Sequence, residues 1–196
     1  TDCDFSFVSL DKLGIPFTDV TDADWYLGAV HYAYQYHLIK GTTSTTFEPN
    51  TAMTRAMLVT VLYRMEGSPT VSGSSTFTDL TDSWYQNAVT WAQQNNIVKG
   101  DSATIFDPDN AITREQMVTI LYRYSQYKKY DVSACDDLSG FSDGANVSGY
   151  AADAMKWAVG SGYIFGFDDG TMQAKTTAAR GQVAVILERF CKNHDS

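Results

Sequence analysis

The chain has 196 residues, of which 44% are hydrophobic and 13% aromatic, and this composition excludes a disordered protein because it supplies ample apolar surface for a core. Its 14 lysines and arginines face 23 aspartates and glutamates, so the formal net charge is −9. A negative chain lacks the long-range attraction to phosphate on which nucleic-acid binding depends, so nucleic acid is not an expected partner. No stretch approaches the roughly 18 uninterrupted apolar residues of a membrane helix, and membrane insertion is not expected either.

Three cysteines, Cys3, Cys135 and Cys191, leave the disulfide pattern open. They show no CxxC spacing, and three thiols cannot all pair within one chain. A bridge from Cys3 to Cys191 would join the two ends of a ring of units, and a bridge from Cys135 to Cys191 is an alternative. Three thiols are also compatible with the spacing.

The chain repeats itself three times after an apolar lead-in at residues 1–16. The first unit covers residues 17–67, the second 77–127 and the third 141–191. Turn-forming residues between the first two units indicate a linker. Each unit begins with an aromatic residue two positions before an aspartate: Phe17 and Asp19, Phe77 and Asp79, Phe141 and Asp143.

Each unit is expected to begin with a helix that carries one aromatic residue and two alanines at four-residue spacing. This spacing forms one helical stripe, which we interpret as an interior face. The helix then reaches a position where His37, Asn96 or Gly162 indicates a left-handed stop. The stripe residues are Trp25, Ala29 and Ala33 in the first unit, Trp84, Ala88 and Ala92 in the second, and Tyr150, Ala154 and Ala158 in the third.

A loop follows each stop, and a second helix follows the loop. The loop begins at a repeated glycine (Gly41, Gly100 or Gly166) and lacks helical periodicity, so an extended, prong-like excursion is expected. Thr54 and Thr113 are good N-caps for the second helices, and Gln116 completes a capping-box pattern with Thr113. The second helices are amphipathic, and three such faces can bury one another. The sequence therefore predicts a mainly α fold of helix-loop-helix repeats, with a central three-helix bundle around an approximate threefold axis.

These features together resemble the S-layer homology domain family over about residues 17–191. The match comprises the Phe-x-Asp start, the aromatic residue before an alanine-rich helix, the glycine after an apolar pair, the Phe-x-Pro loop and the arginine motif that opens the second helix. The family motif Thr-Arg-Ala-Glu is matched in part by Thr54-Arg55-Ala56-Met57, Thr113-Arg114-Glu115-Gln116 and Ala179-Arg180-Gly181-Gln182. The resemblance implies a three-pronged, pseudo-threefold fold. It also implies binding of secondary cell-wall polysaccharide, often with pyruvate ketals, in grooves between repeats.

The motif arginines Arg55, Arg114 and Arg180 are the positions that the resemblance associates with the acidic glycan. An arginine in the first helical turn can present a planar fork to a carboxylate, and free backbone amides there would add positive potential. The alternative is structural: salt bridges to the repeated Asp19, Asp79 and Asp143, which could also orient the arginines. Arg64, Arg123 and Arg189 lie in the last turn, where cations favour the helix dipole, and we interpret them as structural.

A sugar site also needs an aromatic platform. Tyr32, Trp91 and Trp157, just before the repeated alanine, are the first candidates, and Trp25, Trp84 and Tyr150 are the second. Lys40 and Lys99, beside the repeated glycines Gly41 and Gly100, would add charge to two grooves. Phe165 replaces them in the third unit, beside Gly166, so the groove around Arg180 is expected to be the most altered.

No enzyme is expected. A glycosidase needs two placed carboxylates with separated pKa values, whereas the acids here repeat in every unit, and no GxSxG, P-loop or dinucleotide fingerprint is present. The acidic loops at residues 107–110 and 168–170 lack the ligand series of a calcium site, so no metal or cofactor is expected. The leading hypothesis is a monomeric, non-catalytic module that anchors a larger secreted protein to the cell wall or S-layer of a Gram-positive-type bacterium. The alternative is a protein interaction module on the same scaffold.

Overall fold

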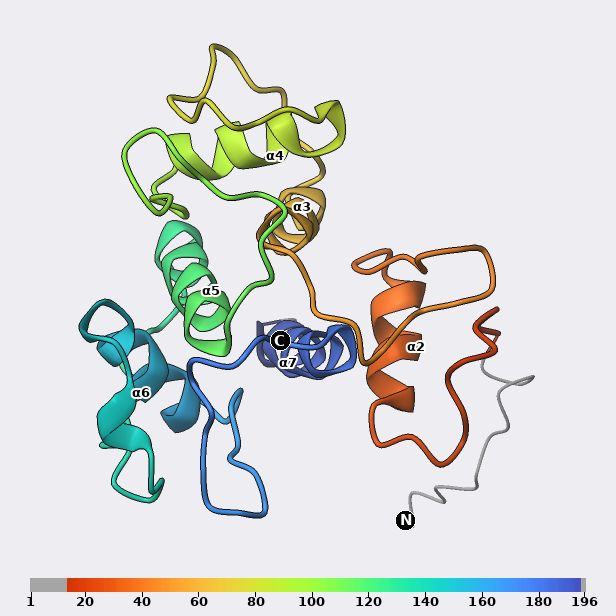
Figure 1. Ribbon diagram of the computed structural model, residues 1–196, viewed down its shortest axis with the longest axis vertical. Coiled ribbons are helices and arrows are strands. Elements are labelled where there is room, and N and C mark those ends of the chain that lie inside the picture. Colours follow the sequence, from red (N-terminus) through yellow and green to blue (C-terminus); the bar gives the residue numbers. More distant parts are fainter. Residues whose placement is uncertain (1–13, 195–196) are drawn as a thin grey trace.

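The computed structural model describes residues 14–194, and within this range the regular structure is helical, without a β-sheet (Figure 1). The main helices are α2 (Leu27–Gln35), α3 (Arg55–Met65), α4 (Ser83–Gln94), α5 (Arg114–Lys128), α6 (Ala152–Gly160) and α7 (Arg180–His194). Two short 3-10 turns, η1 (Gly144–Asn146) and η2 (Gly149–Ala151), precede α6. The fold class predicted from the sequence, three helix-loop-helix repeats, is confirmed.

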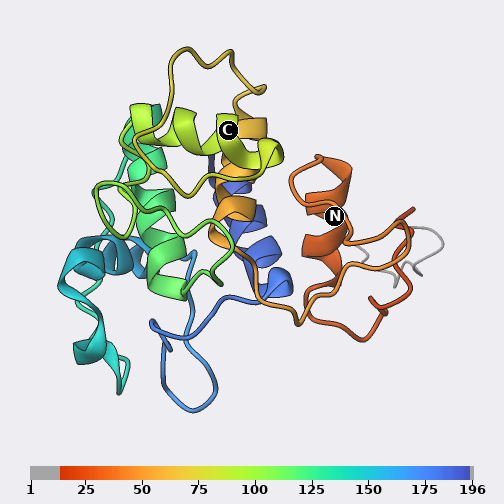
Figure 2. The same ribbon diagram turned by 45° about the horizontal axis from the view of Figure 1, so that its top comes forward.

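Helices α3, α5 and α7 lie together at the centre, and α2, α4 and α6 lie outside them (Figures 1 and 2). Each central helix begins at the repeated arginine, as predicted. Thr54 Oγ1 accepts from the backbone N–H of Met57, and Thr113 forms the expected capping box with Gln116. The three apolar faces meet in the middle of the molecule, which supplies the core that a single unit would lack.

The outer helices pack on a neighbouring unit. Helix α4 of the second unit packs on α3 of the first, and α6 of the third unit packs on α5 of the second. Helix α2 of the first unit packs on α7 of the third, which closes the ring. We call each outer helix and the central helix on which it packs a lobe. Each lobe is therefore built from two different sequence repeats.

A closed cycle of backbone hydrogen bonds joins the segments that enter the central helices. Met53 N–H donates to Ala178 O at 2.9 Å, Ala178 N–H donates to Ile112 O at 2.8 Å, and Ile112 N–H donates to Met53 O at 2.8 Å. All three side chains are buried. One residue from each unit takes the same place in this cycle, a pattern consistent with a pseudo-threefold arrangement.

The alanine stripe is buried and the helix stops are left-handed, as predicted. Ala29 and Ala33 of α2 and their counterparts in α4 and α6 have at most 3% of their surface exposed. The stop residues His37, Asn96 and Gly162 have φ values of 57°, 59° and 72°. The aromatic member of the stripe behaves differently, because Trp25 precedes α2 and is 68% exposed.

Each loop folds back on the start of its own unit. The Asp19 carboxylate accepts hydrogen bonds from the backbone N–H groups of Phe47 and Glu48 at 2.8 and 2.7 Å, and Asp79 and Asp143 do the same in their own units. The ring of Phe17 occupies the space that a Cβ at Gly41 would need, and Phe77 and Phe141 stand in the same relation to Gly100 and Gly166. The repeated Phe, Asp and Gly thus fix the shape of the prong.

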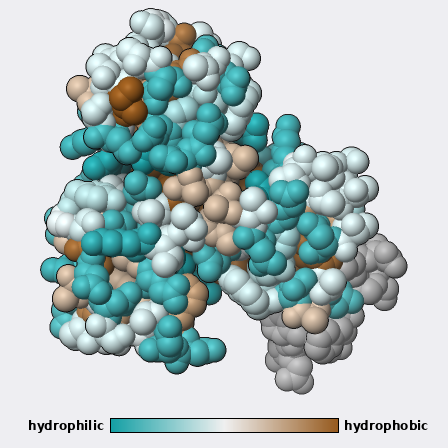
Figure 3. All heavy atoms as spheres, in the orientation of Figure 1, coloured by the Kyte–Doolittle hydropathy of each residue, from teal (hydrophilic) through white to brown (hydrophobic). Residues whose placement is uncertain are grey.

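Apolar surface is visible where the three lobes meet (Figure 3). None of the helices in residues 14–194 is long and apolar enough to cross a membrane. Cys135 carries an exposed free thiol, so the bridge from Cys135 to Cys191 is not formed. Cys3 and most of the lead-in segment lie outside the described residues, and the other pairing stays a prediction.

Candidate functional site

The motif arginines extend from one unit into the next. Arg55 Nε donates to the backbone oxygen of Phe106 at 2.8 Å, and the Arg55 guanidinium lies 4.8 Å from the centre of the same phenyl ring. Arg114 makes the equivalent contacts with Met172 O and the Phe167 ring. Arg180 makes them with Phe47, which returns from the third unit to the first. The arginines therefore join neighbouring units.

The first backbone amides of the central helices also bind the neighbouring loop. The N–H groups of Arg55 and Ala56 donate to the carbonyl oxygens of Asn110 and Pro108 at 3.0 and 2.9 Å. The same pair of bonds occurs at the start of α5 and of α7. The expectation that these backbone amides are free is therefore wrong.

Direct salt bridges between the motif arginines and Asp19, Asp79 or Asp143 are not formed, because these carboxylates bind the loop amides of their own units. Among the described residues, the acid that pairs with a motif arginine is Asp101, whose Oδ1 lies 3.4 Å from Arg55 Nη2. This aspartate follows the repeated glycine of the second unit. The repeated aspartates therefore stabilise the loops of their own units and do not pair with the motif arginines.

Burial dominates the electrostatics of the three motif arginines, which are 4–6% exposed. It lowers the pKa of Arg55 and Arg180, and nearby acids, chiefly Asp101 and Glu48 respectively, oppose the effect. Burial lowers the pKa of Arg114 to about 10, with Asp143 opposing it. An arginine with this pKa still carries its charge at neutral pH.

Three cavities of about 430, 420 and 500 Å³ lie between the units, one beside each motif arginine. We call them the Arg55, Arg114 and Arg180 grooves. Each is lined by the motif arginine of one unit and an aromatic residue of another. The remaining unit contributes its central helix and the residues around its repeated glycine (Gly41, Gly100 or Gly166), which we call the glycine segment. Key members are Arg55, Lys99, Arg123 and Tyr150 in the first; Arg114, Phe165, Arg189 and Trp25 in the second; and Arg180, Lys40, Arg64 and Trp84 in the third.

Among the candidate platform residues, those that reach the grooves are Trp25, Trp84 and Tyr150, which are 68%, 49% and 56% exposed. The preference for Tyr32, Trp91 and Trp157 as platforms is wrong. Trp91 and Trp157 are only 4% and 1% exposed, because they fill the contact between an outer and a central helix. Tyr32 is half-buried beside Tyr36 and Lys192, outside the lining of the three grooves.

The sequence interpretation missed the second arginine of each groove. Arg64, Arg123 and Arg189, expected to be structural, line the grooves of Arg180, Arg55 and Arg114. They lie nine residues after a motif arginine, so the central helix brings them along its length to the neighbouring groove. The recurrence of an arginine at this same spacing in all three units was the sequence signal that could have identified them as groove residues.

The charge of each groove follows from which units meet there. Lys99 lies in the Arg55 groove with Asp101, and Lys40 lies in the Arg180 groove, where no lining residue is acidic. Phe165 lies in the Arg114 groove, where it contacts the Arg189 guanidinium at 4.6 Å, and Asp168 is the acid. The expectation that Phe165 alters the groove around Arg180 is therefore wrong, because the arginine and the glycine segment of one unit line different grooves.

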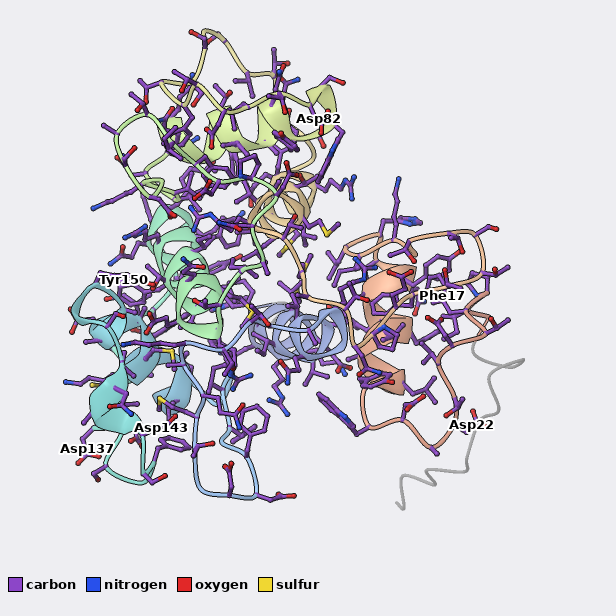
Figure 4. The ribbon with its side chains drawn as sticks, viewed as in Figure 1. Phe17, Asp22, Asp82, Asp137, Asp143 and Tyr150 are labelled. Atoms are coloured by element: carbon purple, nitrogen blue, oxygen red, sulfur yellow. The ribbon has the colours of Figure 1, made fainter. Side chains whose placement is uncertain are left out.

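Tyr150 is anchored by a buried acid. Glu115 is 4% exposed and accepts hydrogen bonds from the Tyr150 hydroxyl at 3.1 Å, the Ser148 hydroxyl at 2.7 Å and the Ser148 N–H at 3.0 Å. Burial, with the Glu115 carboxylate adding to it, raises the pKa of Tyr150 to about 12. Tyr150 lies in η2 beside α5 (Figure 4), and Glu115 holds it at the Arg55 groove.

Comparison with known proteins agrees with the three units. The model of the S-layer homology domain matches residues 16–56, 76–118 and 140–184. These matches cover more than half of the chain, and the chain belongs to the S-layer homology domain family.

Several curated relatives are much longer proteins. An endoglucanase from Bacillus sp. (strain KSM-635) is 30% identical over 172 residues, which are 88% of this chain and 18% of the relative. An amylopullulanase from Thermoanaerobacterium thermosulfurigenes is 29% identical over 87% of this chain and 9% of its own length. A surface-layer 125 kDa protein from Lysinibacillus sphaericus is 27% identical over 81% of this chain and 13% of its own length. The chain thus spans less than a fifth of each of these relatives.

Proposed function

We propose that this chain is a non-catalytic module that binds an acidic secondary cell-wall polysaccharide in its inter-unit grooves and so tethers a larger secreted protein to the cell surface. The family membership and the similarity to a surface-layer protein support the anchoring role. The enzymes among the relatives share only a small part of their length with this chain, which is consistent with an anchoring region beside separate catalytic regions.

One observation carries the glycan proposal: each of the three grooves combines two arginines with at least one exposed aromatic ring. Arginine binds carboxylates through a planar pair of N–H groups, and an aromatic ring offers a flat apolar surface for the face of a sugar. The protein as a whole has a net charge of −9, so the cations concentrated in the grooves provide the local attraction for an acidic chain.

Three modest sites would bind one long polymer more tightly than any single site. Once one groove holds the chain, the others meet the polymer at a high effective concentration. Residence time on the wall would then exceed that of a single groove, without any increase in the strength of one contact.

Isothermal titration calorimetry of the chain against purified wall polysaccharide, before and after chemical removal of ketal pyruvate, tests this proposal. We expect removal of the carboxylates to weaken binding by roughly tenfold or more per groove, because hydrogen bonds to a charged partner are lost. Arg64→Ala should weaken binding, whereas Lys175→Ala removes the same charge from an exposed position outside the grooves and should not. Unchanged affinity after removal of the pyruvate would contradict the carboxylate recognition, and no binding at all would favour a protein interaction module.

A further inference from the structure

A second cavity adjoins the Arg180 groove. This neighbour, of about 260 Å³, is lined by Tyr36, His37, Leu38, Lys40, Arg64 and Met65. It shares Leu38, Lys40 and Arg64 with the Arg180 groove, so the two spaces meet at the two cations. The Arg180 groove, at about 500 Å³, already lies in the usual range of about 300–1,000 Å³ for small-molecule sites. The combined space can hold a longer ligand.

Tyr36 gives the second cavity an aromatic wall. Its side chain is 58% exposed, although its ring packs at 4.5 Å against the ring of Tyr32, which limits its movement. The next residue, His37, has a left-handed backbone that turns the chain back toward Lys40. The positions equivalent to Tyr36 in the other units hold Asn95 and Ser161, so this aromatic wall is specific to the first unit.

The charged side chains that line both cavities are all cationic, although Glu48 and Asp19 lie within electrostatic reach of Arg180. Arg180, Arg64 and Lys40 line them, and neither lining includes an aspartate or glutamate. The Arg180 guanidinium is fixed by hydrogen bonds to the backbone oxygens of Phe47 and Lys40, at 2.8 and 2.7 Å, whereas Arg64 is exposed. An anionic group at the junction would therefore meet Arg64 and Lys40, with the aromatic rings of Trp84 and Tyr36 on either side.

We propose that the Arg180 groove and its neighbour form one extended site for two consecutive sugar residues of an acidic oligosaccharide. This inference rests on the proposed function and adds a second position to one groove. One sugar lies in the groove beside Trp84, its carboxylate lies at Arg64 and Lys40, and the next sugar stacks on Tyr36.

The test compares one-residue and two-residue fragments, prepared by partial hydrolysis of a pyruvylated wall polysaccharide, in calorimetric titrations of the full chain. We expect the two-residue fragment to bind the wild-type chain more tightly. Tyr36→Asn, which introduces the residue of the second unit, should weaken the two-residue fragment by about three- to tenfold and leave the one-residue fragment unchanged. Tyr36→Phe keeps the ring and should keep the affinity for both fragments.

Equal affinity of the two fragments for the wild-type chain would overturn the extended site while leaving the proposed function in place. A loss in Tyr36→Asn that is the same for both fragments would overturn it too. If neither fragment nor the intact polysaccharide binds, the proposed function itself fails. If polyglutamate displaced the two-residue fragment as effectively as the intact polysaccharide does in competition titrations, the site would recognise charge alone, which also contradicts the stacked sugar.

Discussion

Arg180 Nε donates a 2.8 Å hydrogen bond to the backbone oxygen of Phe47, a residue 133 positions earlier in the chain. The guanidinium also lies 4.7 Å from the centre of the Phe47 ring. These contacts close the ring of three units, because they join the start of α7 to the loop of the first unit. The same arginine lines a candidate groove, so one side chain both closes the ring and forms part of the groove wall.

Arg180→Met should lower the free energy of unfolding by about 2 kcal/mol or more, because a buried carbonyl loses its charged donor and the cation–π contact disappears. Urea unfolding measures the change. Arg64→Ala is the control in the same groove: Arg64 is exposed, so its loss should change stability by less than about 0.5 kcal/mol. Equal stability of the two variants would contradict the ring-closing role.

By the same reasoning, Arg114→Ala should lower stability. The family resemblance associates Arg114 with the acidic glycan. Arg114 is 5% exposed and its Nε donates to Met172 O, so a loss of stability of about 2 kcal/mol would accompany any effect of this variant on binding. Arg123→Ala and Arg189→Ala are better probes of the grooves, because both side chains are only half-buried.

Gly41→Ala should destabilise the protein by about 1–3 kcal/mol, because the new methyl group would overlap the Phe17 ring and lie 2.5 Å from Thr43 O. Gly28→Ala is the matched control. Gly28 lies inside α2 with open space around it, and the substitution should stabilise the protein by about 0.5–1 kcal/mol. Thermal unfolding should therefore move in opposite directions for the two variants, and a shift in the same direction would contradict the packing of the prong.

Glu115→Ala should lower the free energy of unfolding by about 2 kcal/mol, because it leaves the Ser148 and Tyr150 donors without their buried acceptor. Tyr150→Phe removes one of these hydrogen bonds and should cost about 1 kcal/mol or less. Chemical unfolding compares the two. If Glu115→Ala lowers the free energy of unfolding no more than Tyr150→Phe does, the carboxylate does not anchor the start of the third unit.

Tyr124 should make stability sensitive to alkaline pH. Its hydroxyl donates to Glu66 at 2.6 Å, and burial, with this bond, raises the pKa of Tyr124 well above its ordinary value. Above about pH 10 the unfolded tyrosine loses its proton while the folded one keeps it, so the free energy of unfolding falls as pH rises. Tyr124→Phe should cost about 1–2 kcal/mol at pH 7.

The same variant should lose stability less steeply than the wild type between about pH 9.5 and 11, because it no longer has this tyrosine to ionise. Urea unfolding of both proteins across this pH range measures the difference. If the free energy of unfolding fell in parallel in the wild type and in Tyr124→Phe, Tyr124 would not contribute to the loss of stability at alkaline pH.

The three grooves should differ in affinity for acidic glycan. The Arg180 groove has three cations and no acidic lining residue, whereas the Arg114 groove has two arginines and Asp168. Trp84→Ala should therefore weaken binding more than Trp25→Ala, which removes the corresponding ring from the less positive groove. Calorimetry with the same polysaccharide compares them, and an equal or reversed order would mean that local charge does not rank the grooves.

The sequence was sufficient to predict the units, the central helices and their stops, because these features depend on local periodicity and on residues such as Thr113 and His37 that favour particular backbone angles. It was insufficient for the partners of each helix. A repeat pattern defines a unit but does not say whether its outer helix packs on its own central helix or on a neighbour's. For this reason Phe165 was assigned to the groove of Arg180, whereas it lines the groove of Arg114.

The choice of aromatic platform failed for a related reason. Trp91 and Trp157 lie within the outer helices and fill their contacts with a central helix, where Trp91 meets Tyr63 and Trp157 meets Tyr122. Trp25 precedes its helix and extends beyond the contact into a groove. Helical spacing placed these residues on faces, but it could not tell which faces the neighbouring helix covers.

The exchange of outer helices between units also bears on assembly between chains. A peptide with one sequence repeat would have an outer and a central helix that each need a partner from another repeat, and three such peptides could supply them by the contacts that α2, α4 and α6 make here. The tandem chain therefore has the connectivity of a domain-swapped trimer whose subunits have been joined covalently. Opening the contact between α2 and α7 in two molecules at once would allow them to exchange helices, so this lobe is the expected route to a swapped dimer at high protein concentration.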